Sequence, residues 1–339
     1  MKLDQFKWKY KSRLKRNHRN PPTYDIAAAY NSTNTHLSGL HTVKQKYRHI
    51  NHFFMKSVTL GHTPDADDAF MFYGIASGNI RSPSFEIKHV IEDIEKLNKR
   101  AINHELDITA ISAHAYGFTK DYVILNSGGS FGINYGPIVI SKKNIELKHL
   151  HRYKIGIPGK MTSANLLLKL AIGNFNGVEI IFNEIPKYVS SGLVDAGVVI
   201  HEAQISLGAE FQKILDLGRW WHDFTQGMPV PLGINVISNR SLTIKEIIEF
   251  DELFKSSIVY GLDNLDDALE FAMQFGRGNP KSLIEKFVKM YVNDLTINMN
   301  QEGKNSIIKM LKKAKSSNIL SFEQLLFIDS NRQKIERYY

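Results

Sequence analysis

From Met55 onward, short apolar segments alternate with amphipathic ones, and this alternation restricts the possible folds more than any other feature of the chain. The apolar segments are typical of buried strands, and the segments between them carry apolar residues at helical spacing. Residues 91–103, for example, place Ile94, Leu97 and Ala101 on one helical face. Because strands that alternate with helices favour mostly parallel sheets, we predict an α/β protein.

The predicted strands form two successive blocks, which are followed by a helical stretch. Those of the first block are Ser57–Leu60, Phe85–Val90, Leu106–Ser112, Tyr122–Ser127 and Ile138–Ser141, and those of the second are Lys154–Ile157, Val178–Asn183, Asp195–Ile200 and Leu232–Ser238. Residues 240–339 are expected to be helical. Since the chain is long for one hydrophobic core, we predict two lobes around a central cleft. Lobe 1 would combine residues 55–150 with residues 240–339, whose helices pack on it, and lobe 2 would comprise residues 151–239.

Residues 1–54 differ from the rest of the chain in composition. They carry 11 Lys and Arg against 2 Asp and Glu and account for the whole net charge of +9, so residues 55–339 are balanced. Their apolar residues show little periodicity, and we expect either a disordered basic leader or a start assigned too early, with Met55 as the first residue. A basic arm can bind polyanions loosely. We nevertheless expect no nucleic-acid partner, because the excess charge is confined to this segment.

Composition also excludes several classes of chemistry. The chain has no cysteine, which rules out disulfides, thiolate nucleophiles and cysteine-ligated metal centres. No segment has the roughly 18–20 apolar residues that a membrane-spanning helix needs. The basic N-terminus is not followed by the apolar core of a secretory signal. We therefore expect a cytoplasmic protein without membrane insertion, and the sequence leaves its oligomeric state open.

Polar side chains follow four of the predicted strands at the point where each ends. In chain order they are Thr63 and Asp65, Ser112 and His114, Thr162 and Ser163, and His201 and Glu202. In open α/β sheets, ligands bind outside the carboxyl ends of the strands. We therefore expect these side chains to meet at one cleft between the lobes, which would bind a small organic anion.

Two of these positions suggest a defined chemistry. Thr162 and Ser163 open a helix, where unpaired N–H groups and the positive helix end can hold a carboxylate or a phosphate. The alternative is an ordinary N-cap, for which Ser and Thr are favoured. His201 ends a very apolar strand, and a neutral imidazole there can accept a proton near neutral pH. Its alternative is a core histidine bonded to a backbone carbonyl.

Other polar segments are interpreted as structural. His114 and His201 lie far apart in the sequence and lack a third ligand, so we expect no metal. The acidic run 65–68 lacks the glycine and glutamate of an EF-hand, and we expect Asp67 to cap the next helix. The glycine-rich segment 127–132 matches neither a phosphate-binding loop nor a dinucleotide-binding pattern. We therefore expect no nucleotide cofactor.

Seven segments, in this order, resemble one enzyme family. They are HTPDADDAFMFYG, IEDIEKLNKRA, ITAISAHAY, SGGSFGINYGPIVIS, GIPGKMTSANLLL, AGVVIHEAQ and DLGRWWHDFTQGMPVPLG. Together they are similar to the 1,4-dihydroxy-6-naphthoate synthases of the futalosine route to menaquinone. The resemblance runs from about Met55 to the C-terminus and leaves residues 1–54 without a counterpart. It implies a fold similar to type II periplasmic binding proteins.

The resemblance also implies an activity and a set of site residues. The activity is that of a lyase that needs no cofactor and releases 1,4-dihydroxy-6-naphthoate from cyclic dehypoxanthine futalosine, with His201 of the IHE element as proton acceptor. The substrate-binding positions are Ala110, Ile111 and Ser112 of the ITAIS element, Thr162, Ser163 and Ala164 of the TSA element, and Asn98 of the LN element. The family often has another residue at position 110, so a contact there would have to come from the backbone.

Two other functions remain open at this point. Chorismate dehydratase, the sister enzyme of the same pathway, shares the PDxDD element, although the IHE and WW elements argue against it. A non-catalytic solute-binding module would have the same fold, but the missing secretory signal and lipid-anchor cysteine argue against export.

Overall fold

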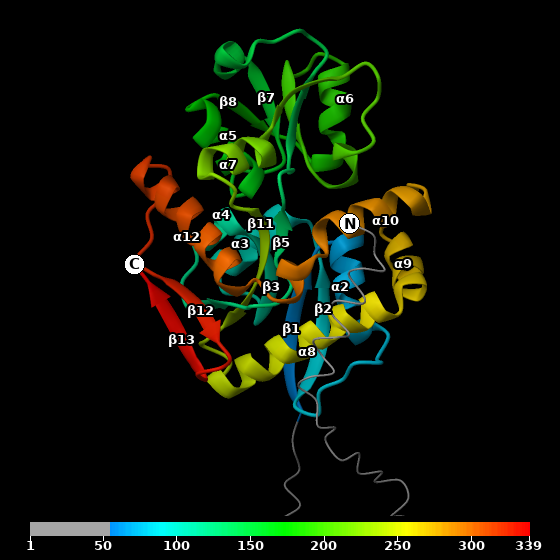
Figure 1. Cartoon of the computed structure of the whole chain (residues 1–339), viewed down its shortest axis with the longest axis vertical. Helices are drawn as coiled ribbons and strands as arrows, with labels where there is room; N and C mark the ends of the chain where they lie inside the picture. Colours follow the sequence, from blue (N-terminus) through cyan, green and yellow to red (C-terminus); the bar gives the residue numbers. More distant parts are fainter. Residues whose placement is uncertain (1–54) are drawn as a thin grey trace, which may run out of the picture. The chain divides into compact units, whose positions relative to one another are not determined.

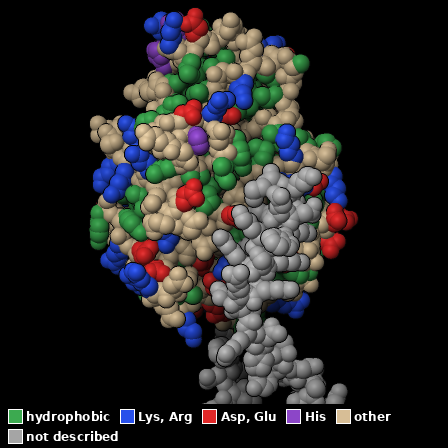
Figure 2. All heavy atoms as spheres, in the orientation of Figure 1, with side chains coloured by type: hydrophobic (Ala, Val, Ile, Leu, Met, Phe, Trp, Pro, Cys, Tyr) green, Lys and Arg blue, Asp and Glu red, His purple; other side chains and the backbone are tan. Residues whose placement is uncertain are grey.

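The computed structural model describes residues 55–339, and the predictions for residues 1–54 lie outside the described residues. Within residues 55–339, no helix combines the length and the hydropathy that crossing a lipid bilayer requires. Basic and acidic side chains are interspersed over the face shown in Figure 2, as expected from the balanced charge of this part of the chain.

The larger of two sheets has eight strands and collects segments from both ends of the described chain (Figure 1). Its strands are β1 (Lys56–His62), β2 (Phe85–Ile91), β3 (Ile108–Ser112), β4 (Tyr122–Ile124), β5 (Ser130–Gly132), β11 (Val230–Ser238), β12 (Leu325–Asp329) and β13 (Lys334–Tyr338). Their order is β13-β12-β4-β11-β3-β1-β2, and β5 pairs with β11. β1 is parallel to β2 and β3, whereas β11 is antiparallel to β3, β4 and β5. The sheet is therefore mixed.

The smaller sheet lies in the middle of the sequence. Its strands are β6 (Ile138–Ser141), β7 (Lys154–Ile157), β8 (Asn176–Glu179), β9 (Ala196–Val199) and β10 (Gln212–Asp216). They are arranged in the order β10-β6-β9-β7-β8. The chain passes from the larger to the smaller sheet between β5 and β6, and it returns between β10 and β11. Two connections thus join the two sheets.

Helices cover both sheets (Figure 1). They are α2 (Ala66–Ala76), α3 (Ile94–Ile102), α4 (Ala113–Tyr116), α5 (Ser163–Ile172), α6 (Ile185–Ser190), α7 (Leu217–Thr225), α8 (Ile244–Asp263), α9 (Leu265–Met273), α10 (Lys281–Tyr291), α11 (Asp294–Ile297) and α12 (Asn300–Ser316), with 3₁₀ turns η1 (Leu147–Arg152), η2 (Phe182–Glu184) and η3 (His201–Gln204). The long helix α8 begins with a capping box, in which the side chains of Thr243 and Glu246 each accept a hydrogen bond from the other residue's backbone N–H. Its buried Phe250, Phe254 and Ile258 follow helical spacing, which is the pattern that predicted this helix.

The strand pairing places two predicted elements in the other sheet. β6, which falls within the predicted lobe 1, pairs with β9 and β10 in the smaller sheet. β11, which falls within the predicted lobe 2, lies between β3 and β4 in the larger sheet. The prediction that residues 240–339 are wholly helical is wrong, because β12 and β13 form a hairpin on the edge of the larger sheet. Apolar strands of this kind reveal that they are buried, but not which strand is their neighbour.

Candidate active site

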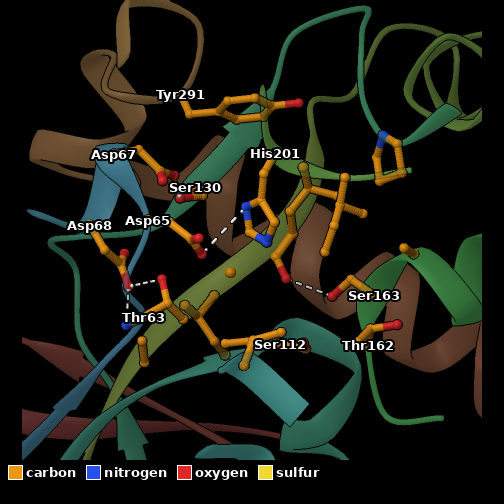
Figure 3. Close-up of a pocket in the computed structure, with 18 of the residues that line it drawn as sticks. Thr63, Asp65, Asp67, Asp68, Ser112, Ser130, Thr162, Ser163, His201 and Tyr291 are labelled. Atoms are coloured by element: carbon orange, nitrogen blue, oxygen red, sulfur yellow. Dashed lines mark hydrogen bonds and ion pairs between the residues drawn. The ribbon is translucent and has the colours of Figure 1, made fainter. Parts of the chain in front are cut away.

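One pocket gathers most of the polar residues that follow the predicted strands (Figure 3). Its walls comprise Thr63, Asp65, Asp67, Asp68, Ile94, Ala110, Ser112, Gly128, Ser130, Pro137, Thr162, Ser163, Ala164, Ile200, His201, Gln204, Leu232, Gly233, Ile234, Asn235, Phe287 and Tyr291. They come from loops and strand ends of both sheets and from α2, α3, α5 and α10. The space between these walls, including the solvent at its open mouth, amounts to about 720 Å³.

His201 begins η3 directly after β9 and lines this pocket. Its Nδ1 atom lies 3.4 Å from Oδ2 of Asp65, and its side chain keeps 17% of its surface exposed. The edge of the imidazole meets the ring of Phe182, with the centroids 4.7 Å apart. The backbone φ of His201 is 57°, in the left-handed region that few residues other than glycine adopt. The imidazole therefore extends toward the pocket and is paired with a carboxylate, unlike the alternative of a core histidine bonded to a backbone carbonyl (Figure 3).

Asp65 occupies the N-cap position of α2, so this helix begins earlier than expected and Asp67 is not its cap. The Asp65 side chain makes no capping hydrogen bond, because it contacts His201 and the guanidinium of Arg277 instead. Burial would raise the pKa of Asp65, but the neighbouring His201 and Arg277 outweigh burial and hold the pKa below its usual value. Asp65 is therefore an ionised partner for the imidazole at neutral pH.

Asp67 and Asp68 lie in the first turn of α2, and their surroundings shift the pKa in the opposite direction to that of Asp65. Burial, followed by the charges of Asp68, Asp65 and Glu202, raises the pKa of Asp67 well above its usual value. Burial raises the pKa of Asp68 to about 6, although its carboxylate accepts hydrogen bonds from the backbone N and Oγ1 of Thr63 at 2.8 and 2.7 Å. Burial and the neighbouring negative charges thus favour the protonated form of Asp67 in the pocket wall. Within residues 55–339, no group of three or more His, Cys, Asp or Glu side chains is suited to hold a metal ion.

The end of β3 contributes two of its three predicted substrate positions to the pocket wall. Ala110 and Ser112 line the pocket, whereas Ile111 is fully buried in the core and points to the other face of the strand. Asn98 does not line the pocket either. It is fully buried behind Ser112, where its amide oxygen accepts a hydrogen bond from the Ser112 N–H at 2.8 Å and its amide nitrogen donates one to Ser112 Oγ at 3.2 Å. The side chains of Ile111 and Asn98 therefore lie behind the pocket wall, and a contact of either residue with the substrate stays a prediction.

Residues 162–164 bring the N-terminus of α5 to the opposite wall. Thr162 Oγ1 accepts a hydrogen bond from the Asn165 N–H at 3.3 Å, so Thr162 is the N-cap. Ser163 Oγ donates to the Leu232 carbonyl at 2.6 Å. Both hydroxyls are thus engaged by the backbone, and the positive end of the helix is what this wall offers to an anion.

Two further polar residues of the predicted cleft stand behind the wall. His114 is buried with its Nδ1 3.3 Å from the Thr162 carbonyl, and Glu202 is buried against Arg277. Neither of them lines the pocket.

Several pocket residues were not predicted. Phe287 and Tyr291 reach the pocket from α10, and the Tyr291 hydroxyl lies 2.9 Å from the side-chain amide of Gln204. Arg277, in the segment between α9 and α10, lies outside the wall but contacts two carboxylates beside it. These residues lack a motif, and only the packing of the C-terminal helices brings them to the site.

Comparison with known proteins agrees with this arrangement. Residues 58–316 match the family described as Menaquinone biosynthesis. The chain belongs to this family. A curated member from Thermus thermophilus, named 1,4-dihydroxy-6-naphtoate synthase, is 32% identical over 264 residues, which cover 77% of this chain and 95% of that protein. A second protein of the same name, from Streptomyces coelicolor, is 26% identical and covers 78% and 95%. The predicted resemblance is confirmed.

Solved structures similar to this member of the menaquinone biosynthesis family define its fold. A crystal structure of a protein from Archaeoglobus fulgidus is 41% identical, with a TM-score of 0.74, and the match covers 78% of this chain and 98% of that one. The ligand-binding component of an ABC-type import system from Staphylococcus aureus has a TM-score of 0.58 at 14% identity, covering 77% and 93%. At that identity the likeness concerns the fold alone, which is confirmed as α/β and similar to periplasmic binding proteins.

Proposed function

We propose that this protein is a carbon–carbon lyase of menaquinone biosynthesis that converts cyclic dehypoxanthine futalosine to 1,4-dihydroxy-6-naphthoate. The family match and the names of both curated relatives support this activity. The observation that carries the proposed mechanism is the pairing of His201 with Asp65 inside the pocket. The partner of the protein is accordingly a small anionic molecule, and the predicted cytoplasmic location remains a prediction.

His201 acts as the general base in this proposal. An ionised Asp65 next to Nδ1 favours the tautomer with the proton on Nδ1, which leaves Nε2 free to accept a proton from the substrate. A base positioned in this way contributes about 10²- to 10⁴-fold to the rate. The proton is removed next to a ketone, and expulsion of a stabilised fragment leaves an aromatic product. Because the product gains aromaticity, this step requires no cofactor.

The opposite wall holds the substrate. The aromatic carboxylate of cyclic dehypoxanthine futalosine is placed at the N-terminus of α5, beside Ser163 and Ala164, where the helix end favours an anion. The wall formed by Ala110 and Ser112 contacts the rings, and Asn98 fixes the orientation of Ser112 from behind. Closure of the two sides around the substrate excludes water and aligns it with His201.

Incubation with cyclic dehypoxanthine futalosine tests this function, with the naphthoate detected by chromatography. The wild-type protein should release the naphthoate, and His201→Gln should lower kcat about 10²- to 10⁴-fold because the general base is lost. Binding of the substrate, measured by calorimetry, should persist in this variant. The matched control is His222→Gln, because His222 lies on α7 outside the pocket wall and its variant should retain full turnover.

Three outcomes would contradict the proposal. Full activity of His201→Gln would remove the general base from the mechanism. Turnover of chorismate in place of the futalosine derivative would identify the sister dehydratase. Stoichiometric binding without any product would identify a solute-binding module.

A further inference from the structure

Arg277 makes an unusual set of contacts for a residue outside the pocket wall. Its Nη2 donates hydrogen bonds to the Asp65 carboxylate and, at 2.9 Å, to the Pro64 carbonyl. Its Nη1 donates to Oε2 of Glu202 at 3.2 Å. The guanidinium also lies over the ring of Phe182, 4.7 Å from the centroid. One side chain thus contacts two carboxylates, one carbonyl and one aromatic face.

The partners of Arg277 belong to opposite sides of the pocket. Pro64 and Asp65 follow β1 of the larger sheet, whereas Phe182 and Glu202 lie in η2 and η3, which follow β8 and β9 of the smaller sheet. Arg277 itself lies in the segment between α9 and α10, two helices that pack beside the larger sheet (Figure 1). Its guanidinium therefore connects the two sides at the point where η3 begins.

Two partners of Arg277 are also the neighbours of His201. Asp65 lies 3.4 Å from Nδ1 of the imidazole, and the Phe182 ring meets the imidazole edge with 4.7 Å between centroids. The side chains of Asp65 and Glu202 are only 3% and 4% exposed, so each carboxylate needs a cation or hydrogen-bond donors. Arg277 has a φ of 52°, and such left-handed backbone persists where surrounding contacts hold it.

We propose that Arg277 is a positioning residue for the base, which joins the two sides of the pocket and fixes Asp65 and Phe182 around the imidazole of His201. This inference rests on the proposed role of His201. It adds that the imidazole is aligned only when the loop after β1 and the turn η3 are held together. Arg277 thereby takes part in the reaction from outside the pocket wall.

A guanidinium suits this role better than an ammonium group. Its planar fork reaches Asp65 with one nitrogen and Glu202 with the other, whereas the ammonium of Lys is a single point charge on a flexible stem. The charge itself also matters. Asp65 interacts with the carboxyl groups of Asp67 and Asp68 as well as with His201 and Arg277. Without Arg277, the pKa of Asp65 should rise, and a protonated Asp65 no longer favours the required tautomer of His201.

The kinetic test compares Arg277→Gln and Arg277→Lys with the wild-type enzyme over the acid and neutral pH range. Arg277→Gln should lower kcat roughly 10- to 100-fold, because misalignment of a reacting group costs that order, with a smaller effect on KM. The pH below which activity is lost on acidification should also be higher than in the wild type, because Asp65 loses its guanidinium partner. Arg277→Lys should restore the pH dependence of the wild type but not its kcat. Arg240→Gln is the matched control, since Arg240 pairs with the exposed Asp121 and both lie outside the pocket wall.

A second readout does not depend on turnover. Nitrogen NMR of ¹⁵N-histidine-labelled protein, with the His201 signals assigned by their loss in His201→Gln, reports the tautomer of this imidazole directly. We expect the Nδ1-protonated form in the wild type and a mixture of tautomers in Arg277→Gln. This measurement remains informative if the wild type fails to convert cyclic dehypoxanthine futalosine, which would refute the proposed function alone.

Two results would overturn the positioning role. One is a wild-type kcat together with unchanged His201 signals in both Arg277 variants. The other is a lower melting temperature with kcat per folded enzyme unchanged, which would reduce Arg277 to a structural contact. If Arg277→Gln does not fold, Arg277→Lys still decides between these outcomes.

Discussion

Neighbouring carboxyl groups at the start of α2 have opposite protonation behaviour. Asp65 pairs with His201 and Arg277, which hold its pKa below the usual value, whereas burial and like charges raise the pKa of Asp67. Pairs of titratable groups whose environments separate their pKa values are typical of sites that exchange protons. In this pocket, Asp65 is suited to orient a base, and Asp67 is suited to donate a hydrogen bond to a ligand.

Substitution of Asp67 by Asn should stabilise the protein at neutral and higher pH. The folded-state pKa of Asp67 is raised, so its contribution to folding is fully present below the unfolded pKa and is lost as pH rises through the folded pKa. Asn has the same shape and never ionises, so the melting temperature of Asp67→Asn should exceed that of the wild type by an amount that grows with pH. Thermal unfolding followed by circular dichroism at a series of pH values measures this difference.

The control for this prediction is Asp266→Asn. Asp266 is exposed on α9 and pairs only loosely with Lys281, at 3.5 Å, so its substitution should shift the melting temperature little at any pH. A melting temperature for Asp67→Asn that stays at or below the wild-type value across the neutral range would show that Asp67 is ionised in the folded protein.

At the scale of elements, the two connections between the sheets pack backbone against backbone. The Leu217 N–H at the start of α7 donates a hydrogen bond to the Pro137 carbonyl at 2.8 Å. A Cβ atom added to Gly218 would overlap the carbonyl group of Tyr135, and one added to Gly136 would lie 2.9 Å from the Cα of Gly218. Glycine is required at these positions because the backbones of the two connecting segments approach too closely for any side chain.

Gly218→Ala should therefore destabilise the protein by about 1–3 kcal/mol or more, since the backbone must move to accommodate the methyl group. Urea unfolding measures this as a lower midpoint. Gly233→Ala in β11 is the control, because the nearest atom to its added Cβ lies at 3.7 Å, an ordinary contact distance. Equal midpoints for the two variants would mean that the connections separate easily, and close packing there would no longer explain how the two sheets are held.

At the scale of the whole molecule, the site depends on segments that are distant in the sequence. The larger sheet is completed only by β11, β12 and β13, which follow the smaller sheet or the C-terminal helices along the chain. The pocket combines the loop after β1, the end of β3, the start of α5, the turn η3 and one face of α10. Both sheets and the C-terminal helices must therefore be folded together before the site exists.

Removal of residues 1–54 should leave turnover unchanged, because every residue of the pocket wall lies between positions 63 and 291. Retention on a heparin column should fall, because the removed segment carries the entire net charge of +9. Activity assays and salt elution of both proteins measure the two effects. Loss of turnover on removal of the segment would show that it contributes to the site.

The sequence by itself determined the local elements and the chemistry available at their ends. Strand-like runs that end at or shortly before Thr63, Ser112 and His201, and the helical spacing in α8, follow from periodicity, which requires only neighbouring residues. The tertiary structure alone decided which of these residues meet. Side-chain alternation turned Ile111 away from the pocket, strand pairing moved β6 and β11 between sheets, and the packing of the C-terminal helices brought Arg277 to Asp65, the partner of His201. Periodicity shows that a face is buried, but contacts between distant segments depend on the packing of the complete fold, and no local pattern encodes them.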